Sequence, residues 1–182
     1  MDSLGPEQLG LTQRRVMISG PLEPGTVAEA CSLLMYLDGC SSDPLTVVIN
    51  SPGGPLGDAM PLADTLDLLR APFTIDVLGR AHGSAGVVVA AAAGSRRIGR
   101  SASISLQLDR RTATPMATAR DLTHIAAFDA DIEATAAAAV ASRIAAADSS
   151  TVTLDWVQNQ FTRGAPFGAA EALKIGLVDH AR

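Results

Sequence analysis

The chain has 182 residues, enough for one domain with a single substantial core. Its net charge of −5 argues against a nucleic-acid partner. The two cysteines, Cys31 and Cys40, fit neither a metal motif nor a disulfide framework, so neither a metal nor a cofactor is expected.

The first residues are expected to stand apart from the rest of the chain. The segment 1–13 is short and polar, and it lacks the basic start and apolar stretch of a signal peptide. A single domain is expected over residues 14–182. No run approaches the roughly 18 apolar residues of a membrane span, so a cytoplasmic protein without membrane partners is expected.

Strands and helices are predicted to alternate along the chain. Strands are expected at residues 14–19, 45–50, 73–78, around Ile98 and at 103–108; helices are expected at 26–37, 58–69, 84–93, 117–147 and 155–161. Gly39 is expected to end the first helix, and the strand at 45–50 to be buried on both faces. This alternation predicts βαβ units with right-handed crossovers, and therefore an α/β fold.

The segment 117–147 carries the longest helical periodicity. Apolar residues recur every three or four positions from Leu122 to Ile132, and four alanines follow at 136–139. Two readings stay open: a good helix former with a solvent face, or a surface of small residues that packs closely against another helix.

A proline and two glycines follow the strand at 45–50, in Ser51-Pro52-Gly53-Gly54. Adjacent glycines can adopt backbone conformations barred to other residues and leave their amides uncovered. Two such amides beside a helix N-terminus suit an incipient oxyanion. An ordinary strand-to-helix turn is the alternative.

Several segments resemble the Clp protease proteolytic subunit, the ClpP family of serine peptidases. The matching segments are Ile49-Asn50-Ser51-Pro52-Gly53-Gly54, residues 15–22, Asp64-Thr65-Leu66, and residues 91–97, 169–172 and 176–179. The resemblance implies an α/β, crotonase-like (ClpP-type) fold, a spiral of ββα and βαβ units. In it, segment 117–147 would be a protruding handle helix through which two rings stack.

The resemblance also assigns site positions. Gly53 and Gly54 match the oxyanion loop, and their amides are expected to face a cleft beside Ser84 and Gln107. The nucleophile position falls on Ser84 or, counted back from Gly94, on Ala85. The alternative for Ser84 is a simple helix N-cap.

The other two triad positions depart from the family. Gln107 stands where the family has its histidine base, and Gly164 where it has the orienting aspartate. Glutamine cannot accept a proton near neutral pH, so the triad is predicted to be degenerate. His82 is the nearest substitute base in sequence, whereas His124 and His180 are expected at the surface.

The same comparison bears on partners. Arg163 matches an arginine that serves inter-ring contacts in the family, whereas Thr46 and Val48 replace tyrosines that line its ATPase-docking pocket. We therefore expect a structural or regulatory ring component that assembles with itself or with an active ClpP paralogue, and meets a Clp ATPase through that paralogue. The alternatives are an active ATP-dependent Clp-type serine endopeptidase subunit using Ser84 and, ranked third, a crotonase-type acyl-CoA binder.

Overall fold

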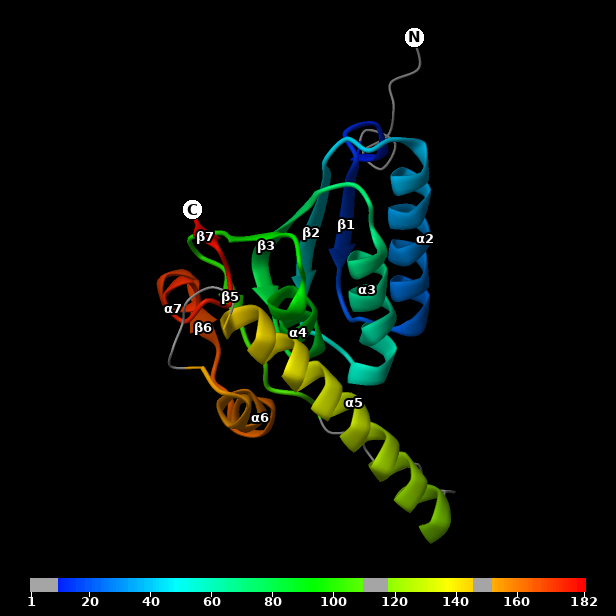
Figure 1. Ribbon diagram of the computed structural model, residues 1–182, viewed down its shortest axis with the longest axis vertical. Coiled ribbons are helices and arrows are strands. Elements are labelled where there is room, and N and C mark those ends of the chain that lie inside the picture. Colours follow the sequence, from blue (N-terminus) through cyan, green and yellow to red (C-terminus); the bar gives the residue numbers. More distant parts are fainter. Residues whose placement is uncertain (1–9, 110–117, 146–151) are drawn as a thin grey trace.

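The computed structural model describes residues 10–109, 118–145 and 152–182, and within them the chain forms a mostly parallel seven-stranded sheet with helices (Figure 1). The strands are β1 (Arg15–Ser19), β2 (Leu45–Ser51), β3 (Phe73–Ala81), β4 (Ser95–Ile98), β5 (Ser103–Ile104), β6 (Phe167–Gly168) and β7 (His180–Ala181). The helices are α2 (Pro24–Cys40), α3 (Leu56–Leu68), α4 (Ser84–Ala91), α5 (Ala119–Ala145), α6 (Leu154–Arg163) and α7 (Ala169–Lys174).

The sheet follows the order β1-β2-β3-β4-β7, and β5 pairs with β3 and with β6. Only the β5–β6 pair within the described ranges is antiparallel. The predicted alternation of parallel strands and crossover helices is therefore confirmed from β1 to β4. None of the helices in the described part of the chain is long and apolar enough to cross a membrane.

One predicted helix end is wrong. Helix α2 continues through Gly39 and ends at Cys40, where Ser41 leaves in an extended conformation. A glycine ends a helix when the chain needs a left-handed residue there. Here the chain leaves the helix in an extended conformation and needs no such residue. Instead, Arg14 binds the helix end: its guanidinium donates to Leu37 O at 2.8 Å and to Ser41 O at 3.0 Å, and Leu37 O also accepts from Ser41 N–H at 3.4 Å.

The expected strand at 103–108 is also shorter than predicted. Strand β5 covers only Ser103 and Ile104, because the chain then turns toward α6, where Leu108 N–H donates to Phe161 O at 2.9 Å. Strand β3 runs longer than expected, to Ala81. The short elements β6, α7 and β7 were not predicted. The ends of the expected helix at 117–147 lie outside the described residues.

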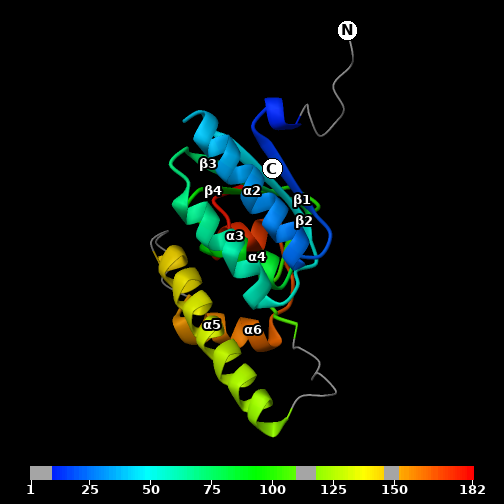
Figure 2. The same cartoon turned by 90° about the vertical axis from the view of Figure 1, so that its right-hand side faces the viewer.

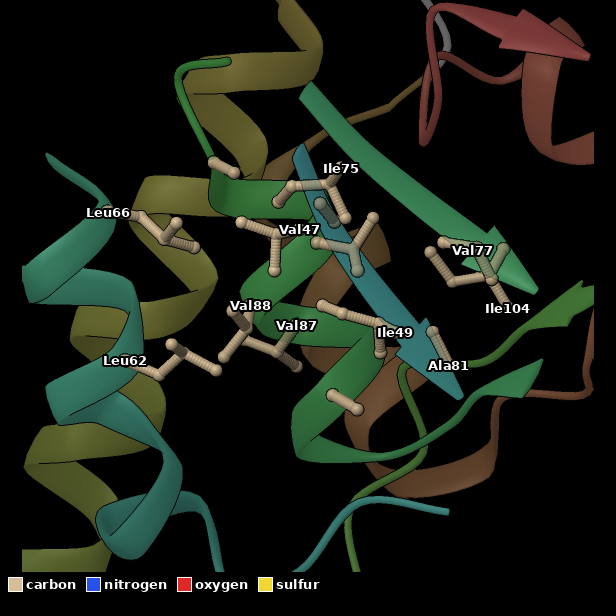
Figure 3. Packing of buried hydrophobic residues seen from close by; sticks show 14 of the residues in the cluster. Val47, Ile49, Leu62, Leu66, Ile75, Val77, Ala81, Val87, Val88 and Ile104 are labelled. Carbon is tan, nitrogen blue, oxygen red and sulfur yellow. The ribbon is translucent and has the colours of Figure 1, made fainter. Parts of the chain in front are cut away.

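The core lies between the sheet and helices α2, α3 and α4. Side chains of β2 and β3 that are at most 1% exposed meet Leu62 and Leu66 of α3 and Val87 and Val88 of α4 (Figure 3). Helices α2 and α3 lie side by side over this face (Figure 2). The burial of these apolar side chains is the dominant stabilising term for such a layer.

The opposite face of the sheet is more open. Met17 on β1 and Leu78 on β3 are exposed, and Asn50 on β2 is exposed beside a buried Val48. The expectation that strand 45–50 is buried on both faces is therefore wrong at its end. The helices of the described residues cover one face of β2 completely, and the other face is covered only in part.

Helix α5 has two different halves. Ala136, Ala137, Val140 and Ile144 are fully buried against the body, where α5 contacts α4 and α6. Its first half projects away from the sheet (Figure 1) and carries exposed Leu122, Ile125 and Phe128. Two of the four alanines thus pack within this chain, and the apolar positions of the projecting half are the ones left at the surface.

An ion pair between a buried arginine and a half-buried aspartate joins β4 to the C-terminal segment. The side chain of Arg96 is fully buried and donates to both carboxylate oxygens of Asp179, at 2.6 and 3.1 Å, and to Ala90 O at 2.9 Å. The Arg96 amide also donates to Asp179 Oδ2. The three nitrogens of the buried Arg96 guanidinium therefore each have a hydrogen-bond partner.

Candidate active site

The Gly53-Gly54 corner requires glycine at both positions. Gly53 has φ +92°, and a Cβ built on it would lie 2.5 Å from the carbonyl oxygen of His82. A Cβ on Gly54 would collide with the carbonyl oxygen of Leu22. Three backbone segments therefore approach one another more closely than any larger residue allows.

Both corner amides are engaged in hydrogen bonds inside the protein. Gly53 N–H donates to Ser51 Oγ at 3.0 Å, and Gly54 N–H donates to Ser84 Oγ at 2.9 Å. We expected these amides to face a cleft without a partner in the protein. That expectation is wrong, because each amide donates a hydrogen bond to a serine hydroxyl. The second bond nevertheless brings the corner against Ser84.

Ser84 is the first residue of α4, directly after Gly83, which has φ +56° and forms the N-cap. Ser84 is therefore not the N-cap that one sequence reading suggested. Its hydroxyl meets the corner, whereas the next residue, Ala85, donates its amide to His82 O at 3.1 Å. The geometry favours Ser84 over Ala85 at the nucleophile position, but the Ser84 side chain is fully buried.

Gln107 approaches this site through its backbone. A Cβ on Gly83 would lie 3.3 Å from the carbonyl oxygen of Gln107, so the two turns are in contact. Gln107 is exposed, and its amide donates to Ser105 Oγ at 3.2 Å. Across residues 10–109, 118–145 and 152–182, no histidine or carboxylate is hydrogen-bonded to the Ser84 hydroxyl.

Gly164 lies at the C-terminal end of α6, next to the segment that carries Gln107. The Leu108–Phe161 backbone bond joins the two segments, and Gly164 N–H donates to Gln160 O at 2.9 Å. A Cβ on Gly164 would lie 2.5 Å from Gln160 O and 2.8 Å from Gln160 Oε1. The room that an aspartate side chain needs is therefore filled by the last turn of α6.

The neighbouring Arg163 is the final residue of α6 and is exposed, which leaves it free to meet another molecule's surface. Trp156 on the same helix is half-buried and stacks on Phe167 with ring centroids 6.0 Å apart, and Phe161 is buried.

The His82 side chain is hydrogen-bonded to Ser103 and not to Ser84. Its Nε2 lies 2.8 Å from Ser103 Oγ. Burial, and then the positive charge of Arg80, lower the pKa of His82. His124 and His180 are exposed, as expected. Sequence reasoning missed Ser103. It lies next to His82 only because β3 pairs with β5, which sets Ser103 opposite Arg80.

Comparison with known proteins identifies the family. The family model for Clp protease matches residues 8–181. The chain belongs to the Clp protease family. Similar proteins are the ATP-dependent Clp protease proteolytic subunit of Carsonella ruddii (strain PV), 30% identical over 87 residues, and the ATP-dependent Clp protease proteolytic subunit 1 of Chlamydia muridarum (strain MoPn / Nigg), 35% identical over 88 residues.

Each of these alignments covers 48% of this chain, and 45% and 46% of the respective relative. The chain thus spans about half the length of the curated relatives it matches. The family match and the layered α/β structure together confirm the ClpP-type, crotonase-like fold expected from the sequence.

Proposed function

We propose that this chain is a structural or regulatory subunit of a ClpP-type ring, with little peptidase activity of its own. One observation carries the proposal: the Ser84 hydroxyl accepts a hydrogen bond from Gly54, and no base among the described residues is bonded to it. On this proposal, Ser84 keeps the nucleophile position beside the Gly53-Gly54 corner but lacks the groups that would activate it.

The expected loss of rate is large. General-base catalysis contributes about 10²- to 10⁴-fold, and triad members act as a unit. The exposed Gln107 cannot supply it, and the last turn of α6 fills the space beside Gly164. Because Ser84 is fully buried, a peptide carbonyl would also need the corner to move before it could reach the hydroxyl.

Features of the surface support assembly. The projecting half of α5 carries exposed apolar residues, and Arg163 is exposed at the end of α6. Contiguous exposed apolar residues mark interaction sites on soluble domains. We propose that the domain, residues 14–182, assembles in the cytoplasm with itself or with an active ClpP paralogue. Contact with a Clp ATPase would then run through the paralogue.

The peptidase part of the proposal is tested with the purified chain and fluorogenic short peptides. Hydrolysis should stay at background, and Ser84→Ala should change nothing measurable. Ser101→Ala, at an exposed position, is the matched control. A robust peptidase rate that disappears in Ser84→Ala but survives in Ser101→Ala would overturn the proposal.

The assembly part needs a separate measurement. Size-exclusion chromatography with light scattering, on the chain alone and mixed with the other Clp subunits of the same cell, should give ring-sized species. A species that stays monomeric at every concentration and in every mixture would refute it.

One observation favours the runner-up, an active serine endopeptidase using Ser84. The 2.9 Å bond from Gly54 holds the hydroxyl beside the loop that the family uses for the oxyanion. Stoichiometric modification of Ser84 by a fluorophosphonate would favour this second function over the first.

A further inference from the structure

We propose that Ser103 and His82 form a second nucleophile–base pair, separate from the Ser84 site, that reacts with activated acyl esters. Ser103 Oγ and His82 Nε2 lie 2.8 Å apart. That distance is within the range at which a histidine removes the proton of an attacking hydroxyl. The function proposed above makes no use of either side chain.

The backbone holds both residues in place. Strands β3 and β5 are parallel, with Ser103 opposite Arg80 and Ile104 opposite Ala81. Ser105 N–H donates to Ala81 O at 3.0 Å, and His82 N–H donates to Ser51 O at 3.0 Å. The pair therefore sits on strand ends anchored from β2, β3 and β5, and a preorganised pair loses little entropy when it reacts.

The imidazole is in the protonation state that a base needs. Burial and the nearby Arg80 charge favour its neutral form, so at neutral pH one ring nitrogen can accept a proton. With Nε2 as that acceptor, Ser103 O–H donates to it.

Access separates this pair from Ser84. Ser103 and His82 are both half-buried, whereas the Ser84 side chain is completely enclosed. Unlike Ser84, Ser103 and His82 therefore keep part of their surface exposed, as the approach of a small reagent to this pair requires.

The reaction balances with an ester and water. Ser103 Oγ bonds to the acyl carbon as its proton moves to His82 Nε2, and the bond from the acyl carbon to the leaving oxygen breaks. His82 returns the proton to the leaving group. Water then attacks the acyl-serine with His82 as base, which releases a carboxylic acid and restores Ser103.

The substrate class follows from what surrounds the imidazole. Within the described ranges no carboxylate is bonded to His82, so the imidazolium formed during attack lacks the stabilisation that a triad supplies. The pair therefore suits esters whose leaving group departs easily, such as aryl esters, and not peptides.

The test is to label the full-length protein with a fluorophosphonate and to map the modified residue by peptide mass spectrometry. The label should lie on Ser103. Ser103→Ala should abolish it and the hydrolysis of p-nitrophenyl acetate above background, whereas the neighbouring exposed Ser101→Ala should leave both unchanged. His82→Gln should lower the labelling rate about 100-fold or more.

The pH profile adds a readout that a merely structural bond would not move. The labelling rate should fall as pH drops through the pKa of His82, below the ordinary histidine value of about 6.5. Absence of label overturns the pair and leaves the proposed function standing. Label on Ser84 instead of Ser103 overturns both the Ser103–His82 pair and the proposed function. Label on Ser103 that persists at the same rate in His82→Gln overturns the role of the base.

Discussion

Gly164 stands where the family resemblance predicts an aspartate, and substitutions there test whether the end of α6 leaves room for one. The perturbations are Gly164→Ala and Gly164→Asp. A Cβ at this position would lie 2.5 Å from the backbone carbonyl of Gln160, and real Cβ atoms essentially never come within 3.0 Å of another atom. A backbone oxygen cannot swing away as a side chain can, so the end of α6 must shift.

Overpacking of this kind costs about 1–3 kcal/mol. For a chain of this size, each kcal/mol lowers Tm by about 2–4 °C, so Gly164→Ala should unfold about 2–12 °C below the wild type. Thermal unfolding followed by circular dichroism measures the shift, and urea unfolding measures the free energy independently.

Gly39→Ala is the matched control. A Cβ on Gly39 meets nothing within 4 Å, and the residue lies inside helix α2. Alanine is favoured over glycine in a helix by up to about 1 kcal/mol. The same chemical change should therefore stabilise the protein at Gly39 and destabilise it at Gly164.

The functional counterpart is the double variant Gln107→His with Gly164→Asp. It should stay at background in the peptide assay, because an aspartate that displaces the end of α6 is not held in place to orient the new imidazole. Unfolding at the wild-type temperature, together with peptide hydrolysis that requires Ser84, would refute this steric reasoning.

Three further outcomes follow from other contacts. Asp179→Ala should lower the free energy of unfolding in urea by about 3 kcal/mol, because it leaves the buried Arg96 without its carboxylate; Arg70→Ala, which removes an arginine whose side chain is 76% exposed, should have a far smaller effect. Burial raises the pKa of Asp179, but the hydrogen bonds and charge of Arg96 outweigh it and lower that pKa overall. The stability from this carboxylate is therefore complete above about pH 4 and is lost as pH falls through the lowered pKa, so acid titration should bring wild type and Asp179→Ala together. Replacement of Leu122, Ile125 and Phe128 by serine should reduce the assembly size in light scattering without lowering Tm, since all three are exposed; a lower Tm with unchanged assembly would contradict that reading of α5.

The α/β class and the main strands could be predicted because they depend on local apolar runs. The runs at β2 and β3 are long, and the Gly53-Gly54 corner marks the strand end between them. Strands β6 and β7, with two residues each, are too short to show a period. They form only because β5 and β4 offer free edges, which no local pattern encodes.

The site was predictable to the level of residue positions but not of contacts. The family resemblance brought Gly54 and Ser84 together, and their hydrogen bond confirms that proximity. The resemblance could not show that the Gly53 amide is taken by Ser51, because that depends on side-chain rotamers. The His82–Ser103 contact joins residues 21 positions apart and exists only through the pairing of β3 with β5.

From the bond between Arg96 and Asp179 we also expect an order of events during synthesis. Because a chain emerges N-terminal end first, β4 and its arginine exist long before the ribosome has made residue 179. Until then, the interior position of Arg96 would place an unpaired cation in an apolar layer, which is strongly unfavourable. We therefore expect β1 to β3 to form a nascent sheet early, while β4 joins it only when translation is nearly finished.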